Sequence, residues 1–194
     1  MSIELKDICV IFTFICILYN YGFLDVYLDE YLIDDEYVTY DGKTYNGTIV
    51  HPHYDNVYYV GANDEKVTLV NNDTAEDVSY KKVMSFISKD KTDVIRYNES
   101  SFMCGEYAEM VHNNAEQAGI KCAWVSIDFE NKEIGHACNA FNTTDRGIIY
   151  IDCTEGDMTS NVKEGIYYTP ENMYGSSSLS YETMGKIKSY HVFW

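Results

Sequence analysis

Residues 104–153 read CGEYAEMVHNNAEQAGIKCAWVSIDFENKEIGHACNAFNTTDRGIIYIDC, and the order of secondary structure follows from this segment outward. A helix is predicted from about Cys104 to Ala118, because apolar residues recur there at the spacing of one helix face: Tyr107, Ala108, Val111, Ala115 and Ala118. Gly119 follows, where a left-handed C-cap is expected. Three apolar segments come next, and each predicts a strand: residues 122–129, 136–141 and 148–153.

The connections between these predicted strands are short. Residues 130–132 join the first to the second and residues 144–147 join the second to the third, which favours an antiparallel meander. A helix from Ser79 to Lys89 is predicted before them, and residues 187–194 could supply a last strand. Helices followed by an antiparallel sheet give the fold class α+β.

The chain before Asn71 differs in composition from the rest. Residues 25–41 are acidic with interleaved tyrosines and are typical of a solvated spacer. Asp41-Gly42 indicates a turn, and residues 56–60 and 66–70 predict the two strands of a hairpin. We therefore divide the chain into an N-terminal segment (1–24), an acidic spacer with short strands (25–70) and a main domain (71–194).

The segment from Ile8 to Leu24, ICVIFTFICILYNYGFL, contains no charged residue. As a helix it would extend about 25 Å, slightly less than the ~30 Å hydrocarbon core of a bilayer. It fits a membrane anchor, a cleaved signal peptide or a buried helix, and the anchor is favoured because no small-x-small cleavage pattern follows. We expect a soluble part outside the cytoplasm, anchored through this segment, or secreted if the segment is cleaved.

The charge balance excludes two classes of partner. The chain carries 31 acidic and 14 basic residues, a formal net charge of −17. Binding to nucleic acid or to anionic lipid head groups needs clustered Lys and Arg, so neither is expected of this surface. The six cysteines form no C-x-x-C pair, so a structural zinc site is not expected either.

Cys104 is the candidate nucleophile because it stands at the predicted N-terminus of a helix. The unpaired amides and the helix dipole there favour the thiolate and can also hold an oxyanion. A thiolate of this kind needs a base and a group that orients the base. His136 opens one predicted strand and Asp152 lies near the end of the next, so these residues are the candidates for the two roles.

Three motifs, Cys104-Gly-Glu-Tyr-Ala, Gly135-His-Ala-Cys-Asn-Ala-Phe and Tyr150-Ile-Asp-Cys-Thr, resemble the transglutaminase-like superfamily of papain-type thiol enzymes. The resemblance covers about residues 79–154 and is closest to the uncharacterised transglutaminase-like domains of prokaryotic surface and membrane proteins. It implies a Cys-bearing helix packed on an antiparallel sheet. It also implies that Cys104 is the nucleophile, His136 the general base and acid, and Asp152 the orienting carboxylate.

The resemblance implies acyl transfer or hydrolysis at an amide or peptide bond of a protein or peptide substrate, without a metal or organic cofactor. Hydrolysis is favoured over amine transfer because prokaryotic relatives include peptidases. Met103 and Gly105 depart from the residues that many members place beside the Cys. The alternative function is therefore a cell-surface binding module that keeps the fold without catalysis. A third possibility is an adaptor that presents residues 25–41 to a cationic protein.

Two further patterns contain residue types that ligate metals. Glu109-x-x-His112 has the spacing of one carboxylate–imidazole ligand pair, but a di-iron site needs a second copy, so a solvated helix face is expected. His51-Pro52-His53 with Asp55 lacks a third convergent ligand, and a loop is expected there. Asn-x-Ser/Thr sequons begin at Asn46, Asn72, Asn98 and Asn142, and they matter only if the domain is exported.

Overall fold

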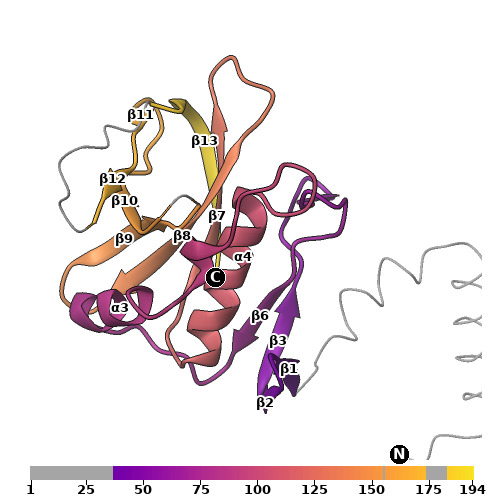
Figure 1. Cartoon of the computed structure of the whole chain (residues 1–194), viewed down its shortest axis with the longest axis vertical. Coiled ribbons are helices and arrows are strands. Elements are labelled where there is room, and N and C mark those ends of the chain that lie inside the picture. Colours follow the sequence, from indigo (N-terminus) through magenta and orange to yellow (C-terminus); the bar gives the residue numbers. More distant parts are fainter. Residues whose placement is uncertain (1–36, 155, 174–182) are drawn as a thin grey trace, which may run out of the picture. The chain divides into compact units, whose positions relative to one another are not determined.

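A seven-stranded antiparallel sheet forms the centre of the structure, a computed structural model that describes residues 37–154, 156–173 and 183–194 (Figure 1). The strand order is β11–β13–β7–β8–β9–β10–β12. The strands are β7 (Ala123–Phe129), β8 (His136–Thr143), β9 (Gly147–Asp152), β10 (Met158–Ser160), β11 (Tyr167–Tyr168), β12 (Glu171–Asn172) and β13 (Gly185–Phe193). The predicted N-terminal segment (1–24) and residues 25–36 of the predicted spacer lie outside the described residues.

The predicted meander is confirmed. Strands β7, β8 and β9 pair in sequence order, with Trp124 opposite Asn139 and Asn139 opposite Ile151. The predicted last strand is β13, which pairs with the outer edge of β7. The turn between β8 and β9 ends at Gly147, whose φ of 71° is readily adopted by glycine. Strand β7 ends at Phe129 and β8 begins at His136, both at the predicted residues.

Helix α4 (Cys104–Gln117) begins at the predicted residue and ends one residue earlier than predicted. Gly119 adopts the expected left-handed conformation, with φ 73°. Its N–H donates to the carbonyl of Glu116, and the N–H of Ile120 donates to the carbonyl of Ala115, so the helix ends in a Schellman motif.

Helix α3 (Tyr80–Ile87) is shorter than the predicted helix, which extended to Lys89. Ser79 occupies the N-cap position, but its side chain makes no capping hydrogen bond. The N–H of Tyr80 instead donates to Oδ1 of Asp145 at 2.7 Å. A carboxylate from the β8–β9 turn therefore caps the helix, and a short 3₁₀ helix, η1 (Thr92–Val94), follows it.

Apolar residues pack on both faces of the sheet, because neighbouring residues of a strand point to opposite sides. On the face toward the helices, one core cluster contains Val83, Ile87, Val111, Ala115, Phe141 and Ile151. On the opposite face, a second cluster contains Val125, Ile127, Ala140, Tyr168 and Ile187. Cys122, Cys138 and Cys153 are buried in these clusters, as expected of structural thiols.

The predicted hairpin between residues 56–60 and 66–70 is wrong. Asp55 and Asn56 both have positive φ and form the turn of a smaller hairpin, β4 (His53–Tyr54) with β5 (Val57–Tyr58). Strand β6 (Leu69–Asn72) pairs instead with β3 (Gly47–Val50), and only an isolated bridge links Val60 to Lys66. The turn at Asp55 and Asn56 pairs residues 57–58 with the strand before the turn. Residues 69–72 are therefore available to pair with β3.

The predicted turn at Asp41-Gly42 is present and joins β1 (Val38–Tyr40) to β2 (Lys43–Tyr45). Residues 37–194 form one compact unit. Because β3 pairs with β6 across the predicted boundary at residues 70/71, the short strands belong to the same unit as the helices and the main sheet. Within the part of the chain that the structure describes, no helix has the length and apolar character needed to span a membrane.

The second face of α4 bonds to the backbone of β6 and the residue before it. Glu109 accepts a hydrogen bond from the N–H of Thr68. Asn113 accepts from the N–H of Val70 at 2.8 Å and donates to the carbonyl of Thr68 at 3.0 Å. Glu116 accepts from the N–H of Asn72 at 3.0 Å. Three helix side chains thus satisfy alternate amides of one strand edge, as a partner strand would.

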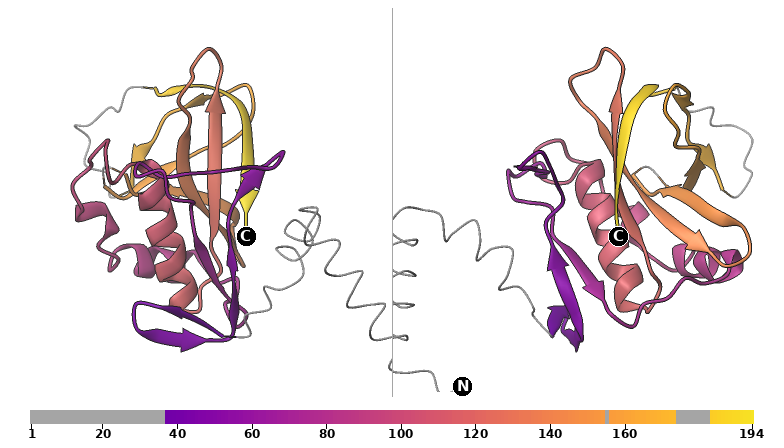
Figure 2. Two further views of the ribbon diagram at one scale, coloured as in Figure 1. Left: turned by 90° about the vertical axis from the view of Figure 1, so that its right-hand side faces the viewer. Right: turned by 180° about the vertical axis from the view of Figure 1, so that it is seen from behind.

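Figures 1 and 2 show the result: α4 lies between the main sheet and the small β3–β6 sheet. The prediction that this face of α4 is solvated is therefore wrong, because Asn113 and Glu116 are each only 3% exposed and His112 is fully buried. Asn113 and Glu116 are buried because their partners are backbone groups that would otherwise lack hydrogen bonds.

Glu116 offers a test of this arrangement, since its second oxygen also accepts from the N–H of Cys122 at 2.8 Å. Replacing Glu116 with Ala leaves the amides of Asn72 and Cys122 without their acceptor. We expect the free energy of unfolding to fall by about 2–4 kcal/mol. Urea unfolding followed by circular dichroism measures the change, and Glu164→Ala, at an exposed position, is the control. An unchanged urea midpoint for Glu116→Ala would contradict this account.

Candidate functional site

The structure brings the three predicted site residues to one place. Cys104 is the first residue of α4, His136 the first of β8 and Asp152 the last of β9. Nε2 of His136 lies 2.6 Å from Oδ2 of Asp152. Both side chains are buried, with 7% of His136 and none of Asp152 exposed. The pairing of β8 with β9 therefore places the imidazole against the carboxylate.

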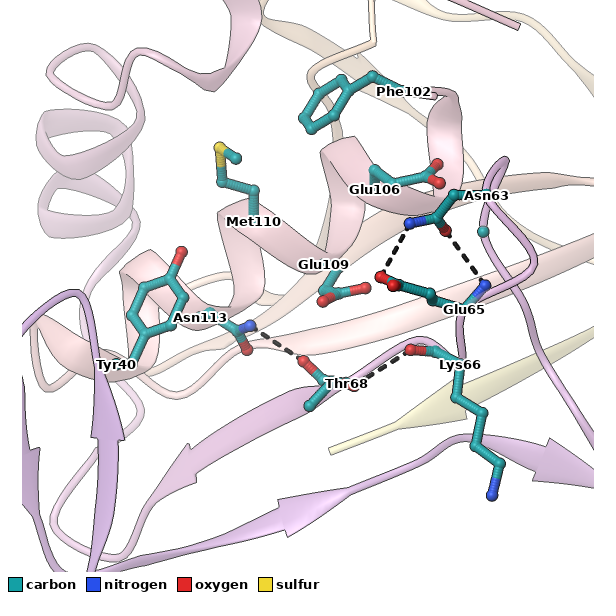
Figure 3. A pocket seen from close by; sticks show the side chains of 11 residues that line it. Tyr40, Asn63, Glu65, Lys66, Thr68, Phe102, Glu106, Glu109, Met110 and Asn113 are labelled. Atoms are coloured by element: carbon teal, nitrogen blue, oxygen red, sulfur yellow. Dashed lines mark hydrogen bonds between the residues drawn. The ribbon is translucent and has the colours of Figure 1, made fainter. Parts of the chain in front are cut away.

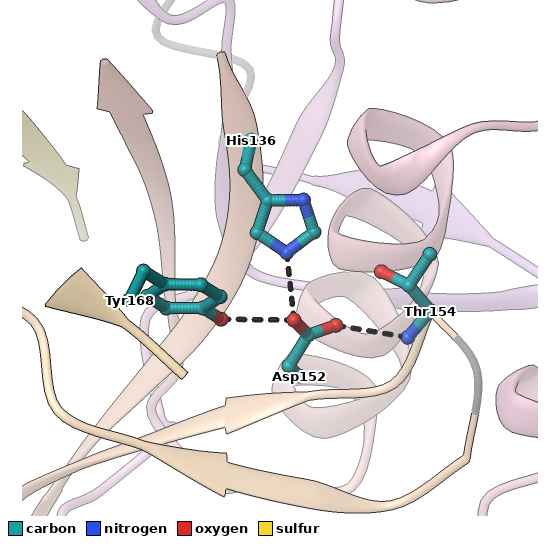
Figure 4. A network of polar contacts seen from close by, with 4 residues as sticks. All are labelled: His136, Asp152, Thr154 and Tyr168. Carbon is teal, nitrogen blue, oxygen red and sulfur yellow. Dashed lines mark hydrogen bonds and ion pairs between the residues drawn. The ribbon is translucent and has the colours of Figure 1, made fainter. Parts of the chain in front are cut away.

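Two further residues hold the carboxylate of Asp152 (Figure 4). The hydroxyl of Tyr168, on β11, donates to Oδ2 at 2.8 Å, and the N–H of Thr154 donates to Oδ1 at 3.0 Å. Thr154 closes the third sequence motif, whereas no local pattern pointed to Tyr168, which follows Asp152 by 16 residues. Three donors thus surround one buried anion, which fixes its orientation toward His136.

The charges of the pair stabilise each other. Burial by itself lowers the pKa of His136, but the charge of Asp152 and the hydrogen bond to it outweigh burial and raise the pKa to about 10. Burial by itself raises the pKa of Asp152, but His136 and the bonds from Thr154 lower it to about 2. At neutral pH the pair is an imidazolium–carboxylate ion pair.

The imidazole also has a side-chain hydrogen bond with Cys104, which contributes to the raised pKa of His136. Figure 4 shows that Nδ1, the ring nitrogen not used by Asp152, points toward α4. Among the described cysteines, Cys104 is the one that is not buried. The geometry therefore places a partly exposed sulfur beside this imidazole.

The N-terminus of α4 is anchored at several atoms. Glu106 accepts hydrogen bonds from the N–H of Met103, at 3.0 Å, and from the N–H of Ala62. The indole N–H of Trp124, on β7, donates to the carbonyl of Gly105 at 3.2 Å. The first-turn amides of a helix have no partner within the helix, so the held terminus can present amides to an anion beside Cys104.

Cys104 and His136 lie between two cavities. The larger, of 870 Å³, is here called the apolar cleft, and its lining includes Asp152 and the side chains of Met103, Phe129, Ile134, Met158, Pro170 and Met184. The smaller, of 200 Å³, is here called the small pocket, and its lining includes Tyr59, Glu106, Trp124, Ser126, Ile127 and Asp128. A substrate bound across both would place its reacting bond at the thiol.

A third cavity, of 250 Å³, lies on the other side of α4's first turns and does not include the three predicted residues (Figure 3). Glu65, Glu106 and Glu109 line it. Burial is the main cause that raises the pKa of Glu109 to about 7; the hydrogen bond from Thr68 lowers it, and the charges of Glu106 and Glu65 raise it. A carboxyl in this position is half protonated near neutral pH.

The rival metal patterns do not converge. His112 is buried, its Nδ1 lies 3.0 Å from Oδ1 of Asn113, and burial lowers its pKa to about 4, whereas Glu109 lines the third cavity. Nδ1 of His51 lies 3.0 Å from the carbonyl of Val67, and Nδ1 of His53 lies 3.2 Å from the carbonyl of His51. Across residues 37–154, 156–173 and 183–194, no group of three or more His, Cys, Asp or Glu side chains could hold a metal ion.

Comparison with known proteins assigns no family. No family model matches the chain, and neither a curated protein nor a solved structure does so. The function must therefore be argued from the site itself.

The ion pair can be tested by Asp152→Asn. This change removes the charge that raises the pKa of His136 but leaves the burial that lowers it. We expect the pKa to fall from about 10 to below the ordinary value of 6.5. NMR titration of the imidazole measures both values. Tyr168→Phe is the control, because it keeps the carboxylate charge; a high pKa of His136 in Asp152→Asn would refute the ion pair.

Glu109 predicts a pH-dependent stability. Its pKa of about 7 in the folded chain exceeds the ordinary 4.5, so its ionisation destabilises the fold as the pH rises between these values. Glu109→Gln removes this effect and keeps an oxygen for Thr68. As the pH rises from 4.5 to 7.5, we expect the free energy of unfolding of Glu109→Gln to increase by about 1–3 kcal/mol relative to that of the original chain. Thermal unfolding at several pH values measures it. Glu99→Gln, at an exposed position, should show no such gain, and an equal result for both variants would contradict the prediction.

Proposed function

We propose that the protein is a thiol enzyme of the transglutaminase-like superfamily that acts on an amide or peptide bond. The observation that carries the proposal is the buried His136–Asp152 ion pair in contact with an accessible cysteine at a helix N-terminus. The site residues are Cys104 as nucleophile, His136 as acid and base, and Asp152 as the group that orients the imidazole. The papain-like core, with a Cys-bearing helix on an antiparallel sheet, is part of the proposal.

The first half of the reaction forms an acyl-enzyme. The thiolate of Cys104 attacks the substrate carbonyl, a carbon–sulfur bond forms, and the first-turn amides of α4 stabilise the oxyanion. The carbon–nitrogen bond then breaks, and the imidazolium of His136 gives its proton to the leaving amine. His136 is now neutral, and Asp152 keeps the ring in position.

The second half releases the acyl group. Neutral His136 takes a proton from water, the resulting hydroxide attacks the thioester, and the carbon–sulfur bond breaks to give a carboxylic acid and the thiolate. An amine in place of water would give transfer rather than hydrolysis. Hydrolysis is proposed as the main outcome, with a protein or peptide as substrate. The proposal also includes a location outside the cytoplasm, at a membrane, through residues 8–24.

The reactivity of Cys104 tests the proposal. The full chain is treated with iodoacetamide between pH 5 and 9, and mass spectrometry follows each cysteine separately. We expect Cys104 to be alkylated below pH 8 at least about tenfold faster than in His136→Ala, because the imidazolium favours the thiolate. The buried Cys122, Cys138 and Cys153 serve as internal controls, since burial raises the pKa of each thiol.

Alkylation of Cys104 as slow as that of the buried thiols would overturn the enzyme proposal. The non-catalytic binding module is the alternative, and Met103 and Gly105 beside the thiol are the observation that favours it. A binding module predicts tight association of a partner that Cys104→Ala does not weaken. Turnover of a peptide substrate that survives Cys104→Ala would equally refute the mechanism.

A further inference from the structure

The larger of the two cavities beside Cys104 has a mainly apolar lining. Six apolar side chains from separate parts of the chain line the apolar cleft: Met103, Phe129, Ile134, Met158, Pro170 and Met184. Its volume of 870 Å³ is within the range of sites that enclose small-molecule ligands. Cys104, His136 and Asp152 are among its lining residues. A group attached directly to the reacting carbonyl can therefore enter it.

The rim of the apolar cleft carries apolar side chains in contact with water. Ile134 is 83% exposed and Tyr97 is 40% exposed. Lys132, also on the lining, donates a hydrogen bond to the carbonyl of Met184, and its ammonium lies 5.7 Å from the ring centre of Phe129. The ammonium group of Lys132 thus interacts with other residues that line the cleft. An apolar ligand would remove Ile134 and Tyr97 from water, which favours binding.

The polar groups on the lining of the small pocket already have partners. The hydroxyl of Ser126 donates to that of Tyr59 at 2.9 Å, Glu106 accepts from the N–H groups of Met103 and Ala62, and Asp128 accepts from the hydroxyl of Ser189. The volume of this pocket, 200 Å³, is also much smaller than the 870 Å³ of the apolar cleft. A bulky group of the substrate is therefore accommodated by the apolar cleft.

We infer that the substrate carries a bulky apolar group on the acyl side of the scissile bond, bound in the apolar cleft. This inference rests on the proposed function, because it takes Cys104 as the nucleophile. An aliphatic acyl chain and the large apolar side chain of a peptide share this chemistry, and they are separated by the choice of probe.

The experiment uses p-nitrophenyl esters and the full chain. One arm compares the acetate, butyrate and hexanoate esters, and the other compares the esters of N-acetylglycine and N-acetylphenylalanine. Nitrophenol release is followed by absorbance and acylation of Cys104 by mass spectrometry, with the rate of Cys104→Ala subtracted. We expect the rate constant to rise about tenfold or more from acetate to hexanoate, or from glycine to phenylalanine, because each buried methylene favours binding.

Ile134→Asp is the matched variant, because the side chain is exposed and its replacement leaves the core intact. It should abolish the preference for the larger group, so that the rate constants of acetate and hexanoate become similar. Ile148→Asp is the control, since Ile148 is 54% exposed on β9 and does not line the apolar cleft. A preference in one arm alone identifies the acyl chain or the peptide side chain as the ligand.

Two outcomes separate this inference from the proposed function. Acylation of Cys104 that depends on His136 but is equally fast for all esters overturns the inference and leaves the thiol enzyme standing. Acylation that does not depend on His136 overturns the proposed function. A size preference that persists unchanged in Ile134→Asp shows that the larger group lies elsewhere, which also overturns the inference.

Discussion

Helix α4 is held from two sides, and the position of the candidate site depends on that restraint. Its apolar face packs on β7–β9 through Val111 and Ala115, while Glu109, Asn113 and Glu116 bond to the edge of β6. Hydrogen bonds from alternate backbone amides fix the position of the helix, because any shift would leave buried polar groups unpaired.

The sheet positions the other two residues of the candidate site, His136 and Asp152. His136 and Asp152 lie on adjacent antiparallel strands, and a slip of one residue in the pairing of β8 with β9 would turn one side chain to the opposite face. Tyr168 and Thr154 then satisfy the remaining hydrogen-bonding capacity of the carboxylate. A buried charge surrounded in this way is stable only with its partner present, so the ion pair and its surroundings form one unit.

The contrast among the cysteines shows how environment sets chemical character. Cys122, Cys138 and Cys153 are buried, and burial raises the pKa of each thiol, which makes them unreactive fillers of the core. Cys104 has the same side chain but lies partly exposed at a helix terminus, in contact with an imidazole whose pKa is raised. Cys104 lines two cavities of different size, so this thiol is both partly exposed and flanked by concave surface.

The α4 helix, the β7–β9 meander and the candidates Cys104, His136 and Asp152 could all be predicted from the amino-acid sequence, because helical spacing, short connections and compact motifs are local features. The sequence could not reveal that Asn113 bonds to Val70, 43 residues away, that β3 pairs with β6, or that Tyr168 completes the environment of Asp152. Polar residues on a helix have the same pattern whether water or a strand edge satisfies them. Only the tertiary structure decided between these partners and formed the two cavities, because both depend on segments that are distant in the chain and meet only after folding.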